Sequence, residues 1–447
     1  MLKELIVFLA LPITTALVFF KSSTSIRRPA AVVRCFTVSE ENNWHEVFGA
    51  LIQEDVLWTA WRDRMPMVFR GLSKCSELNV GSAIEHDGSI VAQAARVDFD
   101  LNRGVGWMNQ AIEREAWSEV ESALEEGTVL FNSAGLAFPQ AAWACAVATQ
   151  ILALPVGGNI YLTNSGIKRS APAHSDRQDV FAVQISGYKH WRVAKPPALT
   201  SVQVDPFARG KGDDILHDNE LDWVLDLILE PGDVLFIPAG CPHETSTAFD
   251  FNSHNKLSTH LTLGAVSGST WGLSYLTLAR LTLSSVDAKG ILDDRLLRRD
   301  SSLHDALHQQ LPLGTAGRML SQPSSVEMTT MDEKELLFDT ISRSPELSRV
   351  FCDVPEDTLL SAFQRIRIHH ADLLVQMQRA YNVSDWAPNS SFAGRLDTHI
   401  DTLAVLIDNL YDWSLPSSKT AAINVDKRSK SKRRKRVKSL QRPRGFG

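Results

Sequence analysis

Cysteine is scarce and scattered in this 447-residue chain, which has five cysteines and no C-x-x-C pair. Zinc ribbons need such pairs, and an odd, widely spaced set gives no support to a disulfide framework. The chain also lacks a Gly-rich phosphate loop, a nucleophile elbow and an internal repeat. These absences argue against P-loop nucleotide-binding proteins, serine hydrolases of the elbow type and repeat proteins.

The composition is that of an ordinary globular protein, with 44% hydrophobic and 22% charged residues and enough length for two or three domains. Charge is unevenly distributed, because eleven Lys or Arg and no acid lie between Lys427 and Arg444. Taking these eleven charges from a net charge of −6 leaves −17 for the rest. We therefore expect an acidic body and a basic disordered tail over 416–447, which acts as a nuclear address, contacts RNA or another anionic surface, or has no partner.

The first 25 residues are expected to be a hydrophobic targeting segment. Sixteen mostly apolar residues, Leu5 to Phe20, are short for a membrane span and close in length to a signal-peptide core. Residues 22–28 are rich in Ser and Arg, as in organelle transit regions. No stable span is expected after processing. Secretory or organellar entry at this end conflicts with a nuclear or nucleolar tail, and a buried segment without a targeting role is the third alternative.

The most informative motif is His174-Ser-Asp176, followed 69 positions later by His243. Two histidines and one carboxylate can hold ferrous iron on one side and leave its other positions open. Residues 181–185 and 230–238 have strand-like patterns beside these ligands, and residues two apart share a strand face. The three side chains can therefore converge inside a small barrel. The chain has thirteen histidines, so a chance H-x-D triplet is the alternative.

The segments flanking this motif occur in a recognisable order. They are Gly158–Thr163, Gly187–Arg192, Pro238–His243 and Ser258–Thr262. Over residues 36–270 this set resembles the JmjC-type Fe(II)/2-oxoglutarate-dependent oxygenases, within them the ribosomal-oxygenase branch of cupin-like histidyl hydroxylases. The resemblance implies an α+β fold. Its core would be a double-stranded β-helix (jelly-roll, cupin/JmjC) barrel with flanking helices, followed by a mainly helical C-terminal region.

The resemblance also implies a role for individual residues. His174, Asp176 and His243 match the iron ligands, and Lys189 matches the lysine that pairs with the distal carboxylate of 2-oxoglutarate. A buried lysine needs an anion, although a surface lysine at a hairpin turn is the alternative. Ser175 departs from the family, in which a bulkier residue is common at this position.

Three further residues are matched to the cosubstrate site. Asn159 and Tyr161 match polar residues that help to hold 2-oxoglutarate, with strand-end capping as the alternative. His260 lies where the family has a cosubstrate-adjacent or supporting histidine, and it could equally be a core histidine.

Other residues near the motif have two interpretations each. Phe181, Trp191 and Phe236 either wall the metal site from water or fill the core. Cys241 either approaches the metal or is a small buried hydrophobe.

The implied activity uses Fe(II), 2-oxoglutarate and O2 to hydroxylate a protein side chain, with release of succinate and CO2. The expected substrate is a histidyl or arginyl residue of a basic protein such as a ribosomal protein, which an acidic body would attract. Demethylation of a lysine in a histone or another protein is the same chemistry. A non-catalytic cupin scaffold that binds RNA or chromatin through its tail is the alternative class.

Residues 271–415 are expected to be helical and, by resemblance, to contain a dimerisation or winged-helix-like unit, which makes a homodimer plausible. Residues 396–410 carry apolar side chains at 4-3-4-3 spacing, and 111–124 and 140–148 also have helical patterns. The pairs His369-His370 and His304/His308 are expected to be helix-surface histidines.

Overall fold

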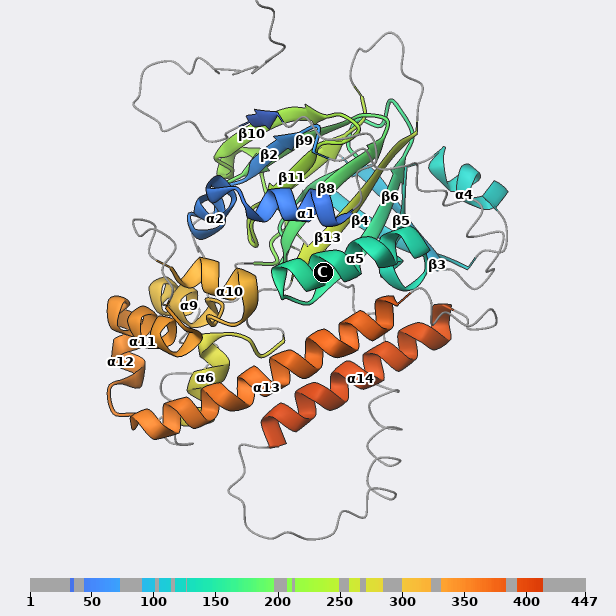
Figure 1. Cartoon of the computed structure of the whole chain (residues 1–447). Helices are drawn as coiled ribbons and strands as arrows, with labels where there is room; N and C mark the ends of the chain where they lie inside the picture. The colour runs from blue at the N-terminus through green and yellow to red at the C-terminus, as the bar shows by residue number, and fades with distance from the viewer. Residues whose placement is uncertain are drawn as a thin grey trace, which may run out of the picture.

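The structure, a computed structural model, describes residues 33–35, 44–72, 91–100, 104–113, 117–125, 127–196, 207–210, 214–248, 257–265, 271–283, 300–322, 331–382 and 392–412. The expected targeting segment and basic tail lie outside these residues. The described part consists of a β-rich half and a helical half, and helix α5 lies between them (Figure 1).

Two mainly antiparallel sheets form the β-rich half. The larger sheet has the order β1-β2-β11-β8-β13-β6-β5-β3-β4 and the smaller one β10-β9-β12-β7. The strands of the larger sheet are β1 (Val33–Cys35), β2 (Met67–Arg70), β3 (Val91–Asp100), β4 (Gly104–Glu113), β5 (Thr128–Phe131), β6 (Val156–Thr163), β8 (Asp179–Ser186), β11 (Val234–Ile237) and β13 (Ser258–Ala265). Those of the smaller sheet are β7 (Ala171–His174), β9 (Lys189–Ala194), β10 (Trp223–Leu229) and β12 (His243–Ser246). This is the expected jelly-roll core.

The central strand β8 is buried from Asp179 to Ile185, so both faces of the larger sheet are covered there. Val180 and Ala182 belong to the apolar cluster of the barrel interior. Phe181 and Val183 face the opposite side, in the larger core that the helices complete. This double burial explains why β8 is a continuous apolar run instead of an alternating one.

Two of the three aromatic residues expected near the metal site, Phe181 and Phe236, lie on the helical side of the larger sheet. The ring centroids of Phe181 and Phe236 are 5.1 Å apart, and Trp61 of α2 (Asp55–Arg62) lies 5.1 Å from Phe236. Phe48 of α1 (Trp44–Ile52) lies 5.9 Å from Phe181. Phe181 and Phe236 therefore fill the core, and their walling role is wrong, because their strand parity directs them away from the barrel interior. Trp191 lies inside the barrel.

Helix α5 (Pro139–Leu152) covers the large sheet beside β6 and β13, as its alanine-rich sequence predicts. Proline at its first turn suits a helix start, and small side chains permit close packing. The approach is closest at Gly158, where an added Cβ would lie 2.7 Å from Cys145 Sγ. Residues 111–113, expected to be helical, belong instead to β4, and the helix of that segment is α4 (Trp117–Leu124).

The helical half contains α6 (Tyr275–Thr282), α9 (Ser301–His308), α10 (Gly314–Ser321), α11 (Glu333–Arg343), α12 (Pro345–Phe351), α13 (Glu356–Tyr381) and α14 (Phe392–Asp412). Helices α13 and α14 run side by side, and α13 also packs on α5 (Figure 1). Among the described residues of 271–412, the β-type pairing is limited to one isolated bridge between Ser274 and Gln310. The helical character and the 4-3-4-3 helix are confirmed, whereas the dimerisation or winged-helix-like role and the domain boundaries stay predictions.

The surface interpretation of the paired histidines is wrong for three of them. His369 and His370 are buried, and their Nε2 atoms donate to Trp271 O at 2.9 Å and Ala153 O at 2.8 Å. His304 is also buried. A helical period identifies the apolar face of α13 but not that helices α5 and α6 cover part of it. Within the described part of the chain, no helix combines the length and apolarity needed to cross a membrane.

Candidate metal and cosubstrate site

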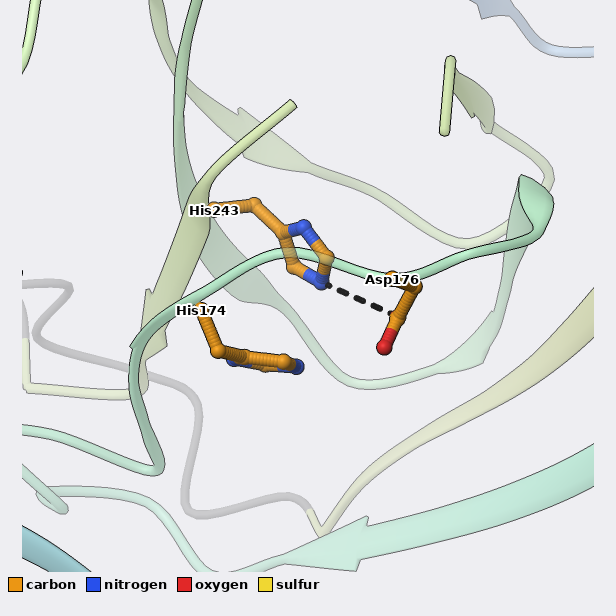
Figure 2. Close-up of side chains that lie close together, drawn as sticks. All are labelled: His174, Asp176 and His243. Atoms are coloured by element: carbon orange, nitrogen blue, oxygen red, sulfur yellow. Dashed lines mark ion pairs between the residues drawn. The ribbon is translucent and has the colours of Figure 1, made fainter. Parts of the chain in front are cut away.

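The two histidines and the aspartate of the motif meet at one end of the small sheet. His174 and His243 are paired residues on β7 and β12, and their ring centroids are 4.4 Å apart. Asp176 lies just beyond the end of β7, with its Oδ2 3.7 Å from His243 Nε2 (Figure 2). One ligand atom from each of the three lies within 4.8 Å of the others. The predicted convergence is confirmed.

Backbone carbonyls fix the tautomer of both rings. His174 Nδ1 lies 2.8 Å from Pro172 O, and His243 Nδ1 lies 3.1 Å from Cys241 O. A carbonyl oxygen can only accept, so each Nδ1 is protonated and donates. When such a ring is neutral, as a metal ligand must be, Nε2 carries the lone pair, and supporting hydrogen bonds of this kind orient metal-binding histidines.

Cys241 belongs to the apolar lining and not to the ligand set. It is fully buried, and its thiol donates to Arg64 O at 3.6 Å. Burial raises the pKa of this thiol to about 12, so the thiolate that binds metals does not form at neutral pH. The interpretation as a small buried hydrophobe holds.

Lys189 lies inside the barrel, at the start of β9 and only 1% exposed. Its Nζ donates to Thr163 Oγ1 at 2.9 Å, and Thr163 shares a 2.9 Å hydrogen bond with Thr128. None of the ion pairs among the described residues includes Lys189, and burial lowers its pKa to about 7. The turn at Gly187, with φ of +61°, is the expected hairpin, but the surface-lysine alternative is wrong.

Tyr161 and His260 face each other across β6 and β13, and their rings stack at 4.6 Å with an interplanar angle of 6°. Burial, helped by the charge of Lys189, lowers the pKa of His260 well below its usual value, so this ring is neutral. His260 Nδ1 is buried and has no hydrogen-bond partner. His260 is thus a buried histidine that lies beside the metal and lysine positions.

Asn159 contacts both the backbone and Tyr161. Its Oδ1 accepts from Ser133 N at 2.9 Å, where Ser133 has a left-handed φ of 54°. Burial and the charge of Asp176 raise the pKa of the Tyr161 hydroxyl, against the effect of a hydrogen bond with the Asn159 side chain. The capping alternative for Asn159 therefore has direct support, and a role toward a cosubstrate stays a prediction for both residues.

Trp191 lies in the barrel interior, beside both His243 and His260. Its ring centroid lies 6.0 Å from that of His243 and 5.3 Å from that of His260. Its buried Nε1 has no hydrogen-bond partner. Thr163 belongs to no motif of the sequence, but its spacing could have indicated it, because it lies two residues after Tyr161 and so shares its strand face.

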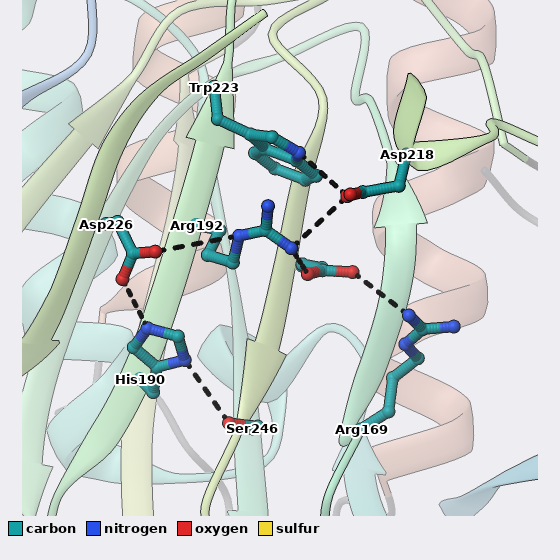
Figure 3. A network of polar contacts seen from close by, with 8 residues as sticks. Arg169, His190, Arg192, Asp218, Trp223, Asp226 and Ser246 are labelled. Atoms are coloured by element: carbon teal, nitrogen blue, oxygen red, sulfur yellow. Dashed lines mark hydrogen bonds and ion pairs between the residues drawn. The ribbon is translucent and has the colours of Figure 1, made fainter. Parts of the chain in front are cut away.

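The opposite face of the small sheet carries a charged network (Figure 3). Arg192 lies over the ring of Trp223 at 4.0 Å and donates to Glu244 at 2.7 Å. His190 and Asp226 are joined at 2.6 Å. These residues alternate with Lys189, Trp191 and His243 along β9 and β12, so they join the strands from outside while their neighbours face the barrel interior.

Residues 135–266 match the family model of the JmjC domain. This segment is a JmjC domain. It contains the three proposed metal ligands and the residues matched to the cosubstrate site.

The curated relatives are similar over limited segments. The bifunctional lysine-specific demethylase and histidyl-hydroxylase NO66 of Drosophila yakuba is 29% identical over 160 residues, which are 36% of this chain and 21% of that protein. Ribosomal oxygenase 1 of Danio rerio is 33% identical over 116 residues, 26% of this chain and 20% of that protein. The chain thus spans about a fifth of the length of these relatives.

Solved structures of ribosomal oxygenase YcfD from Escherichia coli are more distant. One has a TM-score of 0.35 at 16% identity, over 66% of this chain and 69% of that chain. Another has a TM-score of 0.33 at 15% identity, over 83% of this chain and 96% of that chain. The assignment of the jelly-roll core rests on the strand order of the two sheets in this structure.

Proposed function

We propose that this protein is an Fe(II)- and 2-oxoglutarate-dependent oxygenase that hydroxylates a protein side chain and releases succinate and CO2. The observation that carries the proposal is the cluster of His174, Asp176 and His243, whose ligand atoms lie within 4.8 Å of one another. Two neutral imidazoles and one carboxylate on one side are the donor set typical of non-haem Fe(II) oxygenases. The JmjC domain supports the same class.

The side chains present fit both groups. Iron would be held by the Nε2 atoms of His174 and His243 and by the Asp176 carboxylate. The bound iron supplies the coupling between oxidative decarboxylation of 2-oxoglutarate and C–H hydroxylation. Asp176 lowers the net charge of the ligand set, and its side chain, 28% exposed, is the most accessible of the charged groups here.

Lys189 supplies the fit for the cosubstrate. Its buried ammonium has a hydroxyl partner but no carboxylate among the described residues, and a buried cation of this kind is costly without an anion. A dicarboxylate with one end at Lys189 and the other at the metal position would give the Lys189 ammonium a carboxylate partner. Tyr161, Asn159 and His260 line this path, and Trp191 helps to exclude water from it.

The substrate we propose is a histidyl or arginyl side chain of a basic protein, such as a ribosomal protein. The acidic body supports this choice, because a net charge of −17 outside the tail attracts basic partners. Lysine demethylation, for instance of a histone, would use the same site. It is distinguished from side-chain hydroxylation by its product, because formaldehyde is released only when an N-methyl group is hydroxylated. We also propose a homodimer, with the basic tail contacting RNA. For the compartment, secretory or organellar entry and a nuclear or nucleolar address remain the two proposals.

Turnover of 2-oxoglutarate to succinate by the Fe(II)-loaded protein tests the oxygenase directly, with the His174→Ala/Asp176→Ala variant as the control. Turnover that the control lacks supports the proposal. The competing scaffold function predicts that tail deletion abolishes all binding while His174→Ala changes nothing, and that outcome would reject the enzyme.

A further inference from the structure

The residue between the two ligands of the H-x-D motif makes an unusual number of contacts. Ser175 is fully buried, and its N–H donates to Arg209 O at 3.0 Å. Its hydroxyl donates to Phe207 O at 3.2 Å and accepts from Arg209 N at 2.9 Å. Ser175 is thus joined by three hydrogen bonds to residues 207–210, a segment more than thirty positions away that we call the strap.

The strap is fixed on its own side by an ion pair between a buried arginine and a partly exposed aspartate. Arg209 is 8% exposed, and its Nε donates to Asp214 Oδ2 at 2.8 Å. The same carboxylate oxygen accepts from Gly210 N at 2.8 Å. The Asp214 carboxylate therefore contacts two consecutive strap residues and helps to hold the strap where it meets Ser175.

Gly210 brings the strap backbone against the ligand strand itself. Its φ is +73°, and a Cβ there would overlap Ala173 O and lie 2.8 Å from His174 Cα. Only glycine permits both this conformation and this approach. The strap consequently abuts the backbone of one ligand, His174, and is bonded to the residue next to the other, Asp176.

Phe207 connects the strap to two helices. The guanidinium of Arg64, at the end of α2, lies 5.0 Å from its ring centroid. On α9, the rings of His304 and His308 lie 5.3 and 5.8 Å from it and stack on each other at 4.0 Å. The strap is therefore held between the ligand loop and the helical half of the molecule.

We propose that the strap, acting through Ser175, positions His174 and Asp176 for metal binding, so that Ser175, Arg209 and Gly210 are positioning residues of this site. This inference rests on the proposed function. Hydrogen bonds that orient metal ligands typically change metal affinity by about 10–100-fold when they are removed. Ser175→Ala removes both hydroxyl bonds and leaves every proposed ligand in place.

The test is Co(II) binding to the full-length metal-free protein, followed by calorimetry and by the visible absorption of the bound ion. For Ser175→Ala we expect Co(II) to bind at least about tenfold more weakly, with an altered absorption spectrum. Ser321→Ala is the matched control, since Ser321 is a buried serine of α10 whose hydroxyl donates to Gly317 O at 2.8 Å. The two variants should unfold at similar temperatures without metal. Unchanged Co(II) affinity and spectrum in Ser175→Ala would overturn the inference.

A second pair keeps the test decisive if Ser175→Ala does not fold. Gly210→Ala is compared with Gly166→Ala, because Gly166 also has a positive φ, +85°, but a Cβ there would meet nothing within 4 Å. Weaker Co(II) binding in Gly210→Ala alone supports the strap, and equal binding in both variants contradicts it.

Failure of the proposed function has a different signature. Wild-type protein that binds no Co(II), or a His174→Ala variant that binds it as well as wild type, would reject the metal site itself. If Co(II) binds to wild type but equally well to the strap variants, only the inference about the strap fails and the metal site stands.

Discussion

Lys189 makes the affinity for 2-oxoglutarate depend on pH in a range that is easily measured. Its pKa in the cosubstrate-free protein is lowered to about 7 by burial, and a carboxylate beside the ammonium would raise it again. Binding then requires the protonated form, so the apparent Kd grows with the neutral fraction. From about pH 6 to about pH 8 that fraction rises from about a tenth to about nine tenths, which predicts affinity weaker by about tenfold.

The assay is calorimetry of 2-oxoglutarate binding to protein saturated with Mn(II), so that protonation of the histidine ligands does not contribute. Repeating the titration at about pH 8 in two buffers of different ionisation enthalpy should show an uptake of about 0.9 proton. In Lys189→Met, affinity should be lower and independent of pH over this range. A wild-type affinity that does not change between these pH values would refute the assignment of Lys189 to the cosubstrate.

Three further predictions concern stability. Lys189→Met should stabilise the metal-free protein by up to about 5 kcal/mol below about pH 7, since the folded-state pKa of about 7 lies below the usual lysine pKa of 10.5. Because the unfolded chain binds the extra proton between these two values, wild-type stability should rise with pH across that window, and denaturant titrations should show no such rise in the variant. Phe236→Ala should cost about 3–5 kcal/mol while Co(II) affinity in the folded fraction stays unchanged; weaker Co(II) binding would mean that Phe236 does reach the site. Gly187→Ala should cost at least about 1–3 kcal/mol, because its φ is +61° and a Cβ would lie 2.6 Å from Leu257 O; a melting temperature equal to that of wild type would count against this account of the turn.

The sequence was sufficient to predict the parts of the site that depend on local pattern. His174 and Asp176 are only two residues apart, so the motif brings two of the three ligands close together even though Asp176 lies just beyond the end of β7. The pairing of His243 with His174 is a long-range register, and the resemblance to JmjC oxygenases supplied it. The family and the jelly-roll core are confirmed, whereas the cosubstrate roles of Lys189, Asn159, Tyr161 and His260 stay predictions.

The errors have a common physical cause. Strand β8 is apolar on both faces, so alternation could not tell that Phe181 faces the helices while Ala182 faces the barrel. His369 and His370 lie on a helix whose partner surface is a different part of the chain, and burial by distant residues leaves no local signal. The strap is invisible for the same reason, since Ser175 and Arg209 meet only in the folded chain.

The most direct test of the central claim is succinate formation from 2-oxoglutarate by the purified, Fe(II)-loaded protein under oxygen, beside the His174→Ala/Asp176→Ala variant. The account predicts turnover in the wild-type protein, even without a protein substrate, and none in the variant. No turnover in the wild type, together with no binding of iron or 2-oxoglutarate by calorimetry, would contradict it.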